Sequence, residues 1–155
     1  NIMGLPLDNP FEVDLRTVDL NIKMKPAFAS FGLLYPFPGT SISKMAVASG
    51  HFRDDKNTVY LESNKNSSML NWKSKKDKMK VENLQKLAGI IVDFPFLRSI
   101  VPFLCKLPLT KLYHFLFYIH LGYCHKIRLA PIKFKNIFKE LPIFFGYFKT
   151  LVSKT

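Results

Sequence analysis

The sequence predicts an α/β fold in which parallel strands alternate with helices, followed by a mostly helical extension. Residues 1–50 alternate short apolar runs with segments of helical periodicity, in the order strand, helix, strand, helix. Both apolar runs end in a turn that contains proline and glycine. Beyond residue 94, five prolines divide the chain into short segments. The alternation is typical of parallel α/β architecture, either a barrel or an open doubly wound sheet.

The first predicted strand spans residues 1–6, NIMGLP, and a helix follows it directly. Asn9 suits the N-cap, Pro10 suits the first helical position, and Glu12 can reach back as in a capping box. One helical face collects the apolar side chains of this segment, which are Phe11, Leu15, Val18 and Ile22. Pro26 is expected to end the helix.

The second predicted strand spans residues 28–35, FASFGLLY. Its continuous apolar character is typical of a strand that is covered on both faces. The strand closes with the turn YPFPGT at residues 35–40. Thr40 or Ser41 can then cap a short helix, which Gly50 stops.

The chain divides into the end of an α/β unit at residues 1–50, a polar linker at 51–80 and a basic helical extension at 81–155. The net charge of +12 follows this division, because the three parts carry 0, +4 and +8. The linker also contains apolar anchors, which are Tyr60, Leu61, Met69, Leu70 and Trp72. Two strands complete neither a barrel nor an open sheet, and the chain starts inside an apolar run, so we expect a truncated or processed chain with earlier strands upstream.

Functional groups are expected where the two strands end, because in parallel α/β proteins the carboxyl ends of the strands build the site. Gly4 and Pro6 shape the first exit. Pro36 and Gly39 shape the second, which leads into a helix N-terminus that can offer N–H groups to an anion. Turns of this kind are also common where a strand simply ends. Their spacing therefore leaves both a functional and a purely structural interpretation open.

Other candidate residues favour structural roles. Cys105 and Cys124 lie in apolar sequence and read as buried, reduced thiols. His120 shares a helical face with Cys124, but a metal site needs more ligands, so packing is favoured. The lysine-rich run at 73–80 is interpreted as a solvated loop, and no nucleic-acid partner is expected. The apolar stretch 112–124 is shorter than the roughly 20 residues of a spanning helix and is interpreted as a core or interfacial helix.

Two motifs carry a resemblance to a known family. NIMGLP at residues 1–6, followed after a helix by KPAFASFGLLYPFPGT at 25–40, resembles the late barrel region of radical S-adenosylmethionine enzymes. The most similar group has an N-terminal cobalamin-binding domain and includes the anaerobic magnesium-protoporphyrin IX monomethyl ester cyclase family. In that group a Gly-Leu-Pro-Gly-Glu strand end precedes a helix, and a Lys-Pro-acid-x-Ala passage leads to a Pro-x-Pro-Gly-Thr turn. The matching residues are Gly4, Leu5, Pro6, Lys25, Pro26, Ala29, Pro36, Pro38, Gly39 and Thr40.

The resemblance implies that residues 1–50 form the last βαβα portion of a partial parallel (β/α) barrel. The intact protein would then be a radical S-adenosylmethionine enzyme that methylates or cyclises a hydrophobic substrate, with a [4Fe–4S] cluster and cobalamin. The chain departs from the pattern at Leu7-Asp8, where the family has Gly-Glu, and at Ala27, where the family has an acid. It also lacks the CxxxCxxC triad that holds the cluster, so this part alone is expected to be inactive.

The resemblance also implies a set of site residues. The residues implied to bind cofactor are Gly4, Leu5, Pro6, Tyr35, Pro36 and Gly39. The first three would lie against the adenine and ribose of S-adenosylmethionine, chiefly through backbone atoms. The last three would line the barrel mouth near cofactor or substrate. Asp8 is interpreted as an exposed acid at a helix start, with a cofactor contact as the alternative.

The basic, aromatic residues 96–155 admit two interpretations, a helical cap on the flank of the barrel or an amphipathic set that binds an anionic membrane surface. The expected partners are a small-molecule or lipid-like substrate, the rest of its own barrel and such a membrane. The expected location is the cytoplasm, including the periphery of the inner membrane face. The alternative function is a non-catalytic basic helical module that binds a membrane surface or a partner protein.

Overall fold

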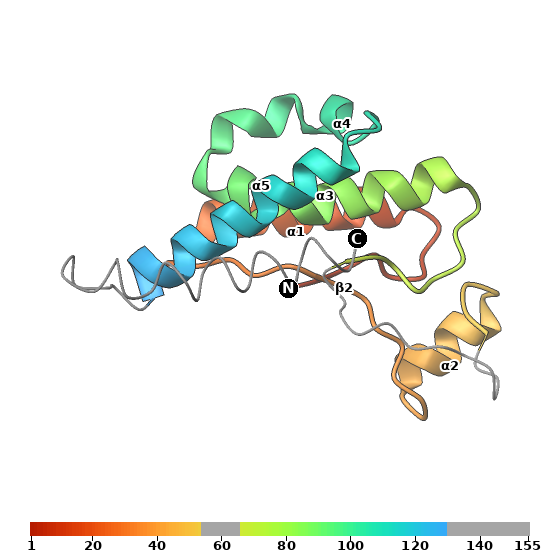
Figure 1. Cartoon of the computed structure of the whole chain (residues 1–155). Coiled ribbons are helices and arrows are strands. Elements are labelled where there is room, and N and C mark those ends of the chain that lie inside the picture. Colours follow the sequence, from red (N-terminus) through yellow and green to blue (C-terminus); the bar gives the residue numbers. More distant parts are fainter. Residues whose placement is uncertain (54–65, 130–155) are drawn as a thin grey trace.

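A computed structural model describes residues 1–53 and 66–129. Within these residues the chain is mostly helical and contains one pair of short strands (Figure 1). The elements in chain order are β1 (Ile2–Met3), α1 (Pro10–Met24), β2 (Gly32–Leu33), α2 (Ser41–Ala48), α3 (Lys75–Asp93), the 3-10 helix η1 (Pro95–Ser99), α4 (Val101–Leu104), α5 (Thr110–Tyr123) and the π-helix η2 (Cys124–Leu129).

β1 and β2 are neighbours and run parallel, with Ile2 opposite Gly32 and Met3 opposite Leu33. The predicted parallel adjacency of the two apolar segments is therefore confirmed. The paired strands are shorter than the predicted segments, because each has a single partner among the described residues and the ladder covers only their overlap. The barrel itself stays a prediction, since two strands do not define one.

α1 begins and ends where the sequence predicts. Asn9 is the N-cap residue, although its side chain makes no capping hydrogen bond, so the predicted capping box does not form. The helix stops at Met24, and Lys25 adopts a left-handed conformation with φ of 49° just before the proline. Leu15 and Val18 are buried, as their helical spacing predicts.

The N-cap of α2 is Thr40, one of the two predicted candidates. Its Oγ1 accepts a hydrogen bond from the N–H of Ser43.

α3 is the central helix and packs against both α1 and α5 (Figure 1). It begins at Lys75, earlier than the pattern from residue 81 predicts. The predicted solvated loop at 73–80 is therefore wrong from residue 75 onward. α3 starts earlier because Ser74 caps its N-terminus. Ser74 Oγ accepts a hydrogen bond from the N–H of Asp77 and donates one to the carboxylate of Asp77.

Two apolar clusters meet the segment around β2, one at Phe31 and the other at Leu34. The larger cluster includes Phe31 and joins β1, α1, α3, α4 and α5. The smaller cluster consists of the buried residues Leu34, Ala46, Phe52 and Leu70, with Leu5, Ile42, Met69 and Trp72 packed against it. The predicted coverage on both faces is confirmed around Phe31 and Leu34, while Ser30 is exposed. The predicted anchoring of the linker is confirmed for Met69, Leu70 and Trp72, and Tyr60 and Leu61 lie outside the described residues.

Polar side chains of α3 tie the helix to its neighbours. Gln85 Nε2 donates to the carbonyl of Phe31 at 2.8 Å, beside β2. Asn83 Nδ2 donates to the carbonyls of Cys105 and Leu107, at 3.1 and 3.0 Å, and so anchors the segment after α4. Buried polar groups of this kind cost free energy unless they are paired, so these contacts fix how the helices sit. Among the described residues, no helix combines the length and the apolar character needed to cross a bilayer.

Candidate functional site

The exit of β1 is held against α1 through Gly4. Its N–H donates to both carboxylate oxygens of Asp14, at 2.9 and 3.2 Å. Gly4 is buried with φ of +70°, and a side chain there would bring Cβ to 3.1 Å from Cγ1 of Val81. Glycine is therefore required both by the backbone conformation and by the space available.

Asp14 is a functional candidate that sequence reasoning missed. Its side chain is only 1% exposed. Burial raises the pKa of Asp14 to about 7, although the hydrogen bond from Gly4 acts in the opposite direction. The sequence could have indicated Asp14, because an acid at position 14 lies on the same helical face as Phe11 and Val18. A polar residue within an apolar face indicates a specific buried partner.

The other predicted residues of the first exit are Leu5 and Pro6. Leu5 is half-buried and packs against the smaller apolar cluster. Pro6 is buried. The chain turns tightly here, since the N–H of Leu7 donates to the carbonyl of Leu5 at 2.8 Å. The predicted rigid turn after β1 is confirmed, and its role in cofactor binding stays a prediction.

The second exit follows β2 along the same sheet edge. Tyr35 is half-buried with its ring centroid 4.5 Å from that of Phe37, and Pro36 is buried. Gly39 has φ of +80° and open space around it, so it serves the backbone reversal into α2. Because β1 and β2 are parallel neighbours, the structure brings both predicted exits to one edge.

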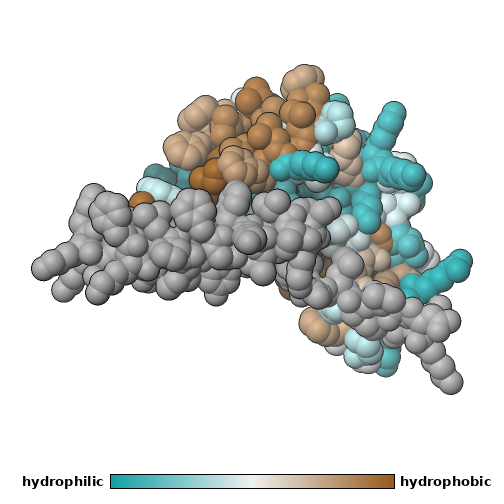
Figure 2. All heavy atoms as spheres, viewed as in Figure 1, coloured by the Kyte–Doolittle hydropathy of each residue, from teal (hydrophilic) through white to brown (hydrophobic). Residues whose placement is uncertain are grey.

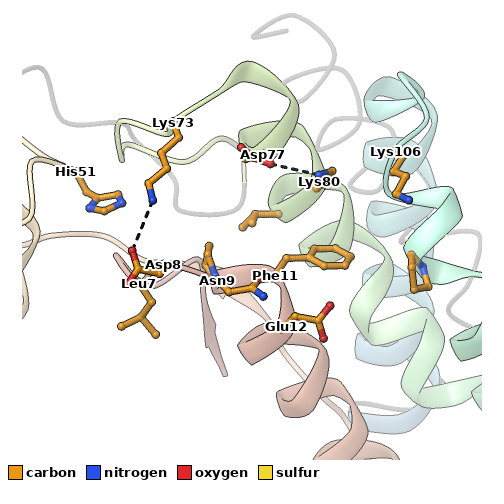
Figure 3. Close-up of a pocket in the computed structure, with 13 residues that line it drawn as sticks. Leu7, Asp8, Asn9, Phe11, Glu12, His51, Lys73, Asp77, Lys80 and Lys106 are labelled. Carbon is orange, nitrogen blue, oxygen red and sulfur yellow. Dashed lines mark hydrogen bonds and ion pairs between the residues drawn. The ribbon is translucent and has the colours of Figure 1, made fainter.

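A pocket of about 360 Å³ lies beside the start of α1 (Figure 3). The six predicted site residues do not line it, and the segment directly after Pro6 does. The lining residues are Leu7, Asp8, Asn9, Pro10, Phe11, Glu12, His51, Lys73, Asp77, Lys80, Val81, Pro102 and Lys106. The pocket therefore lies between the start of α1, the first turns of α3 and the region of α4.

The charges around this pocket are mixed. Lys73 Nζ lies 3.6 Å from Asp8 Oδ1, and both side chains are largely exposed. Lys80 Nζ lies 3.3 Å from Asp77 Oδ1. Exposed ion pairs contribute little stability, so these side chains can exchange partners at small cost. The arrangement suits a polar ligand that carries both signs of charge. Asp8 is exposed, as predicted for an acid at a helix start.

A second polar cluster joins the end of α3 to α5. His120 Nε2 lies 2.7 Å from Asp93 Oδ2 and 3.6 Å from Cys124 Sγ. Arg128 Nη1 donates to the other oxygen of Asp93 at 2.7 Å. The three side chains of Asp93, His120 and Cys124 have the donor types of a metal site.

Asp93, His120, Cys124 and Arg128 form a polar network around the carboxylate of Asp93. Burial raises the pKa of Cys124, and the nearby carboxylate of Asp93 adds to the effect, so the thiol stays protonated. Although burial acts to raise the pKa of Asp93, hydrogen bonds from Arg128 and His120 outweigh it and hold that pKa below its usual value. Cys124 is buried, as predicted, whereas the contact of His120 with Asp93 was not predicted. The preference for packing over a metal site stays a prediction.

Lys86 is a third buried titratable group and was not singled out from the sequence. It is 1% exposed, and its Nζ donates to the carbonyl of Asn66 at 3.1 Å and to Gln85 Oε1 at 2.8 Å. Burial lowers the pKa of Lys86 to about 8, with Glu82 acting in the opposite direction. The sequence could have indicated this burial, because Lys86 lies among apolar residues of α3.

No protein family, curated protein or solved structure matches this chain. The resemblance to radical S-adenosylmethionine enzymes therefore rests on the two sequence motifs, and the family stays a prediction.

Proposed function

We propose that this chain supplies the last strands of the barrel of a radical S-adenosylmethionine enzyme, together with its C-terminal extension. The observation that carries the proposal is the parallel pairing of β1 with β2, which brings the Gly-Leu-Pro and Pro-Phe-Pro-Gly-Thr exits to one edge. Within β1, Ile2 is 61% exposed and Met3 is fully buried.

The residues at the two exits divide into two roles in this proposal. Leu5 and Tyr35 are half-buried and would contact S-adenosylmethionine or substrate with their accessible parts. Gly4 would act as a positioning residue, because its N–H is already engaged by Asp14. Gly39 would position the turn. S-adenosylmethionine, cleaved with an electron from the cluster, would supply the radical that abstracts hydrogen from an unreactive C–H bond. Methylation or cyclisation of a hydrophobic substrate would be the outcome.

The cysteines of this chain do not fit an iron–sulfur cluster. Cys105 and Cys124 are both buried, and burial raises the pKa of Cys105 to about 12. Cluster ligation requires thiolates, and a [4Fe–4S] cluster takes more ligands than two cysteines provide. The cluster and cobalamin would therefore be held by other segments of the intact enzyme.

The experiment that tests the proposal uses the complete product of the gene, purified without oxygen and supplied with a reductant and S-adenosylmethionine. We expect a CxxxCxxC segment upstream in the reading frame and release of 5′-deoxyadenosine. A complete product without that segment, or one that leaves S-adenosylmethionine intact under these conditions, would contradict the proposal.

A further inference from the structure

The helices beyond α3 expose an unusual amount of apolar surface. Six large side chains from η1, α4 and α5, or from the residues that join them, define what we call the apolar face, and each is at least 36% exposed: Phe96, Ile100, Phe103, Leu112, Leu116 and Ile119. Figure 2 shows brown side chains gathered over the part of the molecule where Figure 1 places η1, α4 and α5. Exposed apolar areas of this kind mark interaction surfaces more often than chance.

α5 is apolar on two sides, and among residues 1–53 and 66–129 only one of them packs against another helix. Tyr113 and Phe117 are buried, and α5 packs on α3. Leu112, Leu116 and Ile119 follow each other at steps of four and three residues, which places them on one stripe that is exposed. A surface helix normally turns polar residues outward, so the second stripe needs another covering surface.

The charge of the same segment indicates what covers it. Residues 94–129 contain five basic side chains and no acidic one. Arg98 and Arg128 are paired with acids of α1 and α3. Lys106 and Lys111 are exposed. A surface that combines exposed aromatic rings with an excess of positive charge is complementary to a layer of anionic lipid headgroups.

We propose that the apolar face binds the surface of a bilayer that contains anionic phospholipids. Phe96 and Phe103, which are 75% and 65% exposed, enter the headgroup and acyl boundary. Lys106 and Lys111 contact the phosphates. In this binding mode η1, α4 and α5 lie in the plane of the membrane surface. The inference is independent of the proposed enzymatic function, because it rests on η1, α4 and α5 and not on the strand exits.

The test is flotation of the whole chain with vesicles. Vesicles of phosphatidylglycerol mixed with phosphatidylcholine are compared with vesicles of phosphatidylcholine alone. We expect binding to the first kind and much weaker binding to the second. Raising the salt to about 0.5 M should weaken binding to the anionic vesicles, since the Debye length then falls well below its physiological value. Binding to neither kind would overturn the proposal.

Two variants separate the apolar and the electrostatic contributions. The double variant Phe96→Asp and Phe103→Asp should lower the affinity for anionic vesicles at least about tenfold. Phe37→Asp is the matched control, because Phe37 is 60% exposed but lies in the turn before α2, and it should bind as the parent does. The double variant Lys106→Glu and Lys111→Glu should lower affinity by about fivefold or more for each charge.

If something other than a bilayer covers the apolar face, the measurements give a different result. If the apolar face serves a second copy of the chain, analytical ultracentrifugation will show a dimer that the double phenylalanine variant dissociates, without vesicle binding, and the proposal fails. Circular dichroism of each variant checks the fold. If the double variant unfolds, the single change Ile119→Asn on α5 replaces it. Equal binding of parent, control and variant would also overturn the proposal.

Discussion

The main-chain N–H of Gly4 donates hydrogen bonds to both carboxylate oxygens of Asp14. This contact joins the end of β1 to the buried face of α1 and replaces a sheet partner that the N–H would otherwise need. It also places an acid in the interior, where burial raises its pKa to about 7. The conformation of the first strand exit therefore depends on a titratable group.

Asp14 should make the stability of the fold fall as pH rises from about 4 to about 7. In this window the folded chain keeps a proton that the unfolded chain has lost, since the pKa is 3.8 when unfolded and about 7 when folded. The loss should approach about 4 kcal/mol, from about 1.4 kcal/mol for each pH unit. Urea unfolding at a series of pH values measures it.

The variant Asp14→Asn isolates this effect. An amide oxygen can still accept from Gly4 without carrying charge, so the variant should match the parent near pH 4 and exceed its stability above pH 7. Asp8→Asn, at a fully exposed position, is the control and should leave the pH dependence unchanged. Parallel pH profiles for the parent and Asp14→Asn would show that the buried acid is not destabilising.

Gly4→Ala should destabilise the fold by about 2–3 kcal/mol, because it combines a positive φ with a contact to Val81. Gly39→Ala has a similar φ of +80° but open space around it, and should cost only about 1 kcal/mol. Thermal or urea unfolding of both variants gives the comparison. Equal losses would mean that the space around Gly4 is larger than the structure indicates.

Lys86 should make stability rise between about pH 8 and pH 10.5. The pKa is 10.5 when unfolded and about 8 when folded, so across this window the unfolded chain binds the extra proton. Lys86→Met should remove most of this rise in unfolding experiments. Lys80→Met, at a partly exposed position, should keep it. A rise that persists in Lys86→Met would assign it to another group.

Both thiols should react slowly with a disulfide reagent in the folded protein and rapidly after denaturation. Burial raises the pKa of Cys105 to about 12 and also raises that of Cys124, so little thiolate is present at neutral pH. Single variants Cys105→Ser and Cys124→Ser assign the two rates. A fast phase in the folded state would indicate that the α3–α5 contact opens readily.

The sequence predicted those parts of the fold that depend on local pattern. The spacing of Leu15 and Val18 predicted the buried face of α1, and the apolar run around Phe31 predicted a strand covered on both sides. The start of α3 was missed, because a run rich in lysine resembles a loop unless the cap at Ser74 is recognised.

The candidate site was less predictable than the fold. Gly4 was identified from its turn, but its partner Asp14 was not, since only tertiary packing makes that acid buried. Lys86 was missed for the same reason. The pocket beside α1 also escaped prediction, because its lining combines residues from segments far apart in the sequence, such as Asn9, His51 and Lys106.

The most direct measurement is photochemical cross-linking of labelled S-adenosylmethionine to the complete gene product, followed by mapping of the modified peptides. The proposal predicts label in the peptides that contain Leu5 or Tyr35, with loss of that label when excess unlabelled S-adenosylmethionine is added. Label found only in other peptides of the product, with none at these two strand exits, would contradict it.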